Sequence, residues 1–96
     1  MEQSFGDRLS TLRGAHHFLR QETESLARYG RIETEALRRL RDMARSFQEE
    51  AHSLLVTMAY EGAPEALQEE AEALVRAFSE ALRQLETMLA SSKRVN

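Results

Sequence analysis

The chain of 96 residues has no cysteine and no tryptophan, and it has one proline and four glycines. Without cysteine it can form no disulfide, no thiolate nucleophile and no zinc–thiolate site. β-Branched residues are also scarce, with one Ile, three Val and five Thr. Because a sheet needs such residues to cover its pleated faces, we expect no substantial β-structure.

Four residue types that favour helices or their surfaces dominate the composition instead. Leu (13), Ala (13), Glu (14) and Arg (12) make up 52 of the 96 residues. A chain of this length is enough for one domain, which we expect to span residues 1–96. We therefore predict an all-α fold, either an antiparallel helical hairpin or a three-helix bundle with coiled-coil character.

The charge and the apolar runs limit the partners and the location. The formal net charge of −3 provides no positive field for DNA or RNA, so we expect no nucleic acid partner. The longest apolar runs, such as Leu54–Val56, are far shorter than the roughly 20 residues that cross a bilayer. The N-terminal residues show no secretory leader. We expect a cytoplasmic protein, and secretion without a leader stays open.

Apolar residues recur at the three-four spacing of an amphipathic helix along the first 58 residues. The stripe consists of Phe5, Leu9, Leu12, Leu19, Leu26, Leu37, Leu40, Ala44, Phe47, Ala51, Leu54 and Met58. His16 and Thr23 fill two core positions of its first part with polar groups, and Gly30 and Glu33 interrupt it further on. The first part of the stripe is therefore the less self-sufficient one.

Two structures are compatible with this stripe. One is a continuous helix of about 54 residues, about 80 Å long. The other is a pair of helices joined at Gly30, since glycine enters the left-handed conformation that ends a helix without steric penalty. We expect the break at Gly30 and keep the continuous helix as the alternative.

A second boundary lies at Gly62 and Pro64. Glycine can end one helix there, and proline is tolerated at the first position of the next. The last helix carries an apolar stripe of Leu67, Ala71, Leu74, Phe78, Leu82, Leu85 and Leu89. We predict helices over about 7–29, 32–61 and 64–91. The last two are antiparallel neighbours because their link is short, while the first either folds back onto them or extends to a partner chain.

Several residues suggest chemistry without completing a site. Glu49 and His52 have the Glu-x-x-His spacing of di-iron bundles, but at 100° per residue both fall on the side opposite Phe47 and face solvent. His16 and His17 have no nucleophile at a catalytic spacing. We predict no catalytic, cofactor-binding or metal-binding residues, and we expect that the protein is not an enzyme.

The basic residues Arg38, Arg41 and Arg45 form a stripe opposite the apolar face of their helix. Such a stripe can bind an acidic protein, phosphates or anionic lipid. Acidic residues outnumber arginines in the same helix, however. The expected state of the stripe is an internally balanced, solvated face, with an acidic partner as the main alternative, and we do not expect a membrane partner.

The C-terminal half resembles the second half of a spectrin repeat. The residues that carry the resemblance are Ala51, Leu54, Leu55, Gly62, Leu67, Leu74, Phe78 and Leu82. Phe78 stands where that family usually has an aromatic residue in its third helix. The resemblance implies a three-helix scaffold or adaptor module.

The turn residues Tyr60, Glu61 and Gly62 are similar to the Trp-any-Gly turn of small secreted helical-hairpin proteins, with Tyr in place of Trp. That second resemblance implies a hairpin that pairs with another hairpin into a four-helix bundle.

We therefore expect a non-enzymatic helical module for protein–protein interaction, such as an adaptor, a scaffold or a small chaperone subunit, within a homo- or hetero-oligomer. The residues expected to carry the fold are Leu40, Phe47, Leu54, Leu74 and Phe78. The residues expected to contact the partner are Leu12, Leu19, Leu26, Arg38, Arg41 and Arg45. The alternatives are a secreted hairpin protein and a peripheral membrane module that binds through the arginines.

Overall fold

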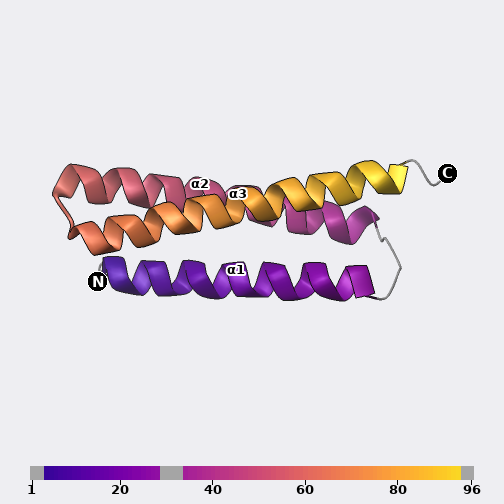
Figure 1. The fold of residues 1–96 in the computed structure, drawn as a ribbon, viewed down its shortest axis with the longest axis horizontal. Coiled ribbons are helices and arrows are strands. Elements are labelled where there is room, and N and C mark those ends of the chain that lie inside the picture. The colour runs from indigo at the N-terminus through magenta and orange to yellow at the C-terminus, as the bar shows by residue number, and fades with distance from the viewer. Residues whose placement is uncertain (1–3, 29–33, 94–96) are drawn as a thin grey trace.

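The computed structural model describes residues 4–28 and 34–93, which form three helices and, within these ranges, no strand. They are α1 (Phe5–Arg28), α2 (Thr34–Glu61) and α3 (Glu65–Lys93). The helices pack side by side as a bundle of 51 × 21 × 18 Å, with α2 antiparallel to α1 and α3 (Figure 1). The prediction of an all-α fold is confirmed, and of the two predicted architectures the described residues form the three-helix bundle.

The alternative of one continuous helix through Gly30 is wrong. α1 ends at Arg28, and it lies against both α2 and α3 instead of extending the axis of α2 (Figure 1). Gly30 itself, with Glu33, lies outside the described residues. Apolar spacing could not decide this point because it continues in the same phase on both sides of the break.

Local hydrogen bonds explain where the helices begin and end. The Ser4 hydroxyl accepts a hydrogen bond from the Asp7 backbone N–H at 3.1 Å, as an N-cap residue does. Gly62 has a φ of 70°, and the Ala63 N–H donates to the Met58 carbonyl at 2.9 Å, which closes the C-terminus of α2. The Pro64 carbonyl then accepts the first backbone hydrogen bonds of α3. The predicted boundary at residues 62–64 is confirmed.

The core is a continuous line of apolar side chains along the bundle axis. Its buried members are Leu9, Leu12, Leu19, Leu37, Leu40, Ala44, Ala51, Leu54, Met58, Ala71, Leu74, Phe78, Leu85 and Leu89. The fully buried ring of Phe78 lies at the meeting point of all three helices. The His16 ring from α1 lies nearly perpendicular to it, with ring centroids 5.5 Å apart, and Phe47 from α2 stacks on it at 5.7 Å.

The three helices do not share the packing equally. α2 and α3 contact each other far more extensively than either contacts α1. The seam of α1 also contains the polar residues that the sequence indicated, because Thr23 is buried and His16 is partly buried. The Thr23 hydroxyl donates a hydrogen bond to the Leu19 carbonyl of the same helix at 2.7 Å, so it needs no partner on another helix. The α2–α3 hairpin is therefore the main unit, and α1 is the more weakly packed helix.

Truncation of Phe78 tests the central packing. We expect Phe78→Ala to lower the free energy of unfolding by about 3–5 kcal/mol, since the cavity lies between all three helices. Urea unfolding followed by circular dichroism measures the change. Phe18→Ala is the matched control because that ring is 45% exposed, and it should cost about 1 kcal/mol or less. Equal losses in the two variants would contradict the central position of Phe78.

Two glycine substitutions should change stability in opposite directions. Gly14 lies inside α1, and an added Cβ meets no heavy atom within 4 Å, so Gly14→Ala should stabilise the protein by about 0.5–1 kcal/mol. Gly62 has a positive φ that a side chain disfavours, so Gly62→Ala should destabilise it by about 1–2 kcal/mol. The same urea titration tests both variants, and a shared sign would contradict the description of the two sites.

Candidate interaction surfaces

The leucines predicted to contact a partner lie inside this chain's own bundle. Leu12 and Leu19 are 3% and 0% exposed, and Leu26 is partly buried against the core. Packing within the chain thus uses the surface that the sequence assigned to a partner. The physical reason is that α1 folds back onto α2 and α3, where its apolar stripe completes the core. These leucines can meet another chain only if α1 leaves the hairpin.

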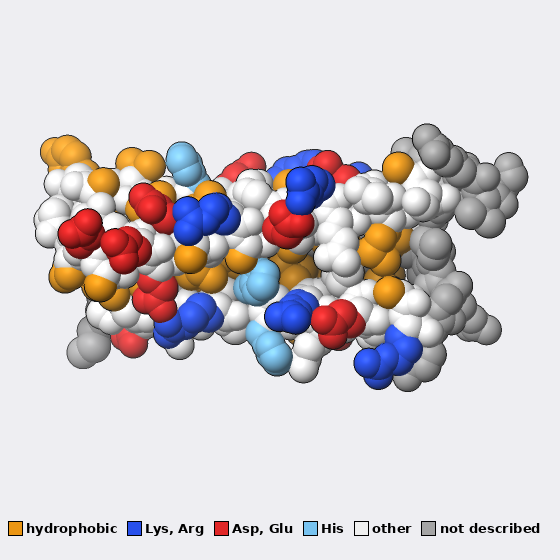
Figure 2. Space-filling model, viewed as in Figure 1, with side chains coloured by type: hydrophobic (Ala, Val, Ile, Leu, Met, Phe, Trp, Pro, Cys, Tyr) orange, Lys and Arg blue, Asp and Glu red, His pale blue; other side chains and the backbone are white. Residues whose placement is uncertain are grey.

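A groove runs between α1 and α3, with a volume of about 470 Å³. Figure 2 shows hydrophobic side chains between these two helices, with charged side chains on both sides. The lining residues are His16, Arg20, Thr23 and Glu24 from α1, with Ala77, Glu80, Ala81 and Gln84 from α3. Ala77 and Ala81 are spaced by one turn, so they leave a shallow, small-residue surface beside α1. Sequence reasoning missed this groove.

The charged residues along the groove are neutralised within their own helices. Arg20 pairs with Glu24 at 3.2 Å on α1, and Arg83 pairs with Glu80 at 2.5 Å on α3. These pairs are exposed, so they contribute little to stability. The groove therefore has no excess of one charge that would select an ionic ligand.

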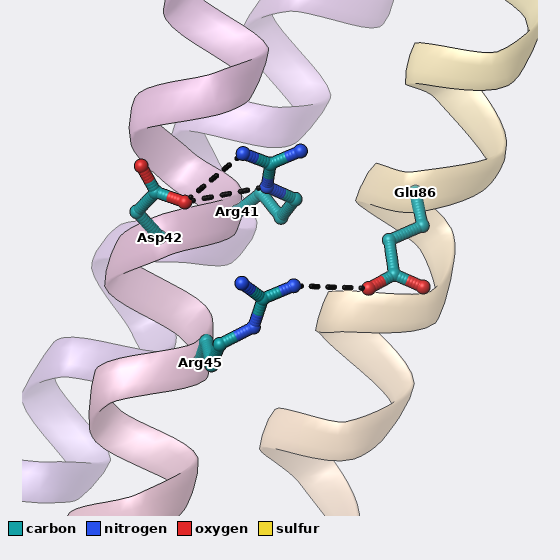
Figure 3. A network of polar contacts seen from close by, with 4 residues as sticks. All are labelled: Arg41, Asp42, Arg45 and Glu86. Atoms are coloured by element: carbon teal, nitrogen blue, oxygen red, sulfur yellow. Dashed lines mark hydrogen bonds and ion pairs between the residues drawn. The ribbon is translucent and has the colours of Figure 1, made fainter.

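The arginine stripe on α2 is also largely paired within the chain. Arg41 contacts Asp42 at 3.2 Å, and Arg45 reaches across to Glu86 of α3 at 3.7 Å (Figure 3). Arg38 is exposed. The carboxylates of Asp42 and Glu86 thus offset two of the three guanidinium charges that would otherwise meet an acidic partner or a lipid surface.

The Glu-x-x-His pair faces solvent, as the helical wheel predicted. Glu49 and His52 are exposed, and they line a second hollow on α2 with Gln48, Ser53 and Val75 of α3. Nearby, the Gln48 side-chain amide donates to the Ser79 hydroxyl at 2.5 Å and links α2 to α3. In the described parts of the chain, no three His, Asp or Glu side chains come together as a group that could hold a metal ion.

Comparisons of the chain with protein-family models, with curated proteins and with solved structures give no match. The resemblance to a spectrin repeat therefore stays a prediction. Of the residues that carry the second resemblance, Tyr60 lies in the last turn of α2 with a 90% exposed side chain, and Gly62 lies in the turn that follows. Among the described helices, none combines the length and the apolar character needed to cross a membrane.

A double-mutant cycle on Arg45 and Glu86 tests how strongly the stripe is held to α3. Both side chains are 51% exposed, so we expect a coupling energy of about 0.2–1 kcal/mol between Arg45→Ala and Glu86→Ala. Unfolding free energies of the wild type, the two single variants and the double variant give this value. A coupling that persists undiminished in 1 M salt would contradict an exposed ion pair.

Proposed function

We propose that the protein is a non-enzymatic helical interaction module in which the α2–α3 hairpin is a stable platform and α1 is an exchangeable cover. The observation that carries this proposal is the unequal packing of the bundle. The hairpin shares the most extensive contact, whereas α1 covers its apolar face through a seam that includes His16 and Thr23. A partner helix can take the place of α1 without disturbing the hairpin.

The polar contacts between helices follow the same division. α2 and α3 are joined by the part-buried Gln48–Ser79 hydrogen bond, and also by the Arg45–Glu86 ion pair, which is half-exposed and contributes little. In the described ranges, the one ion pair from α1 to another helix is that of Arg13 with Glu70, and both side chains are at least one-third exposed. Since exposed ion pairs contribute little, α1 is held mainly by its apolar residues.

The local stability of α1 is low for a further reason. Gly14 stands in its interior, and glycine is less favourable than alanine within a helix by about 0.8–1.0 kcal/mol. An isolated helix of this length is marginal in water and depends on packing for its stability. Opening of α1 therefore requires less free energy than unfolding of the whole bundle.

The chemistry of the covered face defines the partner. Phe78 and the leucines of the hairpin present an apolar surface to α1, so the ligand that fits is an amphipathic helix with leucine at heptad spacing. This mode of binding suits an adaptor, a scaffold or a small chaperone subunit. The cytoplasm is the compartment that we propose for it.

Native-state hydrogen exchange tests whether α1 opens by itself. We expect the amides of α1 to exchange with a lower free energy of opening than the central amides of α2 and α3. Gly14→Ala should raise the free energy of opening of α1 more than that of the hairpin. If all three helices exchange only through global unfolding, the proposal of an exchangeable α1 is wrong.

Binding of an added helix tests the platform directly. A fluorescent peptide with the sequence of residues 4–28 should bind the full chain saturably in an anisotropy titration. The matched control is the same peptide with Leu12→Glu and Leu19→Glu, which should not bind because its apolar stripe is interrupted. Equal signals from the two peptides, or no binding by either, would contradict the proposed function.

A further inference from the structure

We infer that the helix that replaces α1 comes from a second copy of this chain, so that two copies exchange their α1 helices in a domain-swapped dimer. This inference rests on the proposed function and names its partner. Each chain in the dimer would lend α1 to the other hairpin. The core of each hairpin would then be completed by the other chain.

Every contact that holds α1 in place can be supplied by another copy. His16 makes a T-shaped contact with Phe78, Arg13 pairs with Glu70, and Leu12 and Leu19 fill the core. All of these join α1 to the hairpin, and none depends on the two parts belonging to the same chain. A second copy is therefore a fully complementary partner, which is the physical basis of domain swapping.

The heptad phase favours an open form of the chain. Leu12, Leu19 and Leu26 follow each other at seven residues, and Leu40 follows Leu26 at two heptads. The second core position of the heptad keeps the same phase, since Thr23 and Leu37 are also two heptads apart. Two helices that fold back on each other do not need a common phase. A chain that extends α1 away from its own hairpin keeps the apolar stripes before and after Gly30 and Glu33 on one side only if the phase is shared, as it is here.

The exchange depends on protein concentration because it joins two chains. In the single chain, α1 returns to its own hairpin because its effective concentration there is high. At higher protein concentration a second copy competes for the same hairpin and offers the same contacts. The dimer should therefore form from the monomer as concentration rises, with no change in the face that α1 covers.

Site-specific cross-linking distinguishes a swapped dimer from other states. The chain has no cysteine, so Arg13→Cys with Glu70→Cys introduces two thiols where α1 meets α3. A short bis-maleimide should join them within one chain at low concentration. In the dimer fraction isolated by size exclusion at high concentration, it should join two chains into a covalent dimer of twice the mass. The single variants Arg13→Cys and Glu70→Cys are the controls and should give no such dimer.

Three results would overturn the inference. They are a chain that stays monomeric by sedimentation up to several hundred micromolar, a dimer fraction whose cross-links stay within one chain, and covalent dimers of equal yield in the single-cysteine controls. The proposed function fails separately, since binding of the 4–28 peptide does not require that the full chain dimerises. Peptide binding with cross-links only inside the chain would retain the function and remove the self-exchange.

A matched pair of length variants tests the same point without cross-linking. Deletion of residues 27–33 removes one heptad, keeps the apolar phase and joins α1 directly to α2, so α1 cannot fold back in its own chain. We expect a stable dimer of twice the single-chain mass with the helix content of the parent. Insertion of six Gly and Ser residues at position 31 should instead give a monomer. A monomeric deletion variant, folded or unfolded, would contradict the swap.

Discussion

The packing of Phe78 is the interaction on which the rest of the structure depends. Each helix alone is marginal in water and becomes stable only when its apolar stripe is covered. The three stripes converge on this one ring, with the His16 ring nearly perpendicular to it and Phe47 stacked against it. Phe78 therefore joins the apolar faces of the three helices at one point of the core.

The two rings that contact Phe78 come from helices that are packed to different extents. Phe47 joins it from a helix that also bonds to α3 through Gln48 and Arg45. His16 joins it from a helix whose seam includes the buried hydroxyl of Thr23 and whose interior contains Gly14. From a bundle built in this way we expect a cooperative hairpin and a helix of lower local stability. Regions of low local stability are the ones from which binding elements are drawn.

Much of the fold could be predicted from local rules. Gly62 and Pro64 mark a helix boundary by backbone geometry alone, and the apolar stripes of α2 and α3 follow from a spacing of three and four residues. The break between α1 and α2 was harder because the stripe continues in phase through Gly30 and Glu33. The fold-back of α1 onto its own hairpin depends on long-range packing, which the shared heptad phase alone did not reveal.

For the candidate surfaces too, the sequence predicted features of a single helix but not the contacts between helices. A helical wheel placed Glu49 and His52 on the solvent side, since that depends only on angle along one helix. It could not show that Arg45 meets Glu86, because the register of α2 against α3 decides which residues face each other. The Ala77–Ala81 surface was missed for a related reason. Alanine is common throughout the chain, and these two residues line a groove only because α1 lies beside them.

The common direction of α1 and α3 has a mechanical consequence. α1 begins at one end of the bundle and α3 finishes at the other, along a long axis of 51 Å (Figure 1). Anything joined ahead of α1 and anything joined after α3 would be held apart by the length of the bundle. The folded bundle would therefore fix this separation, and release of α1 from the hairpin would make it variable.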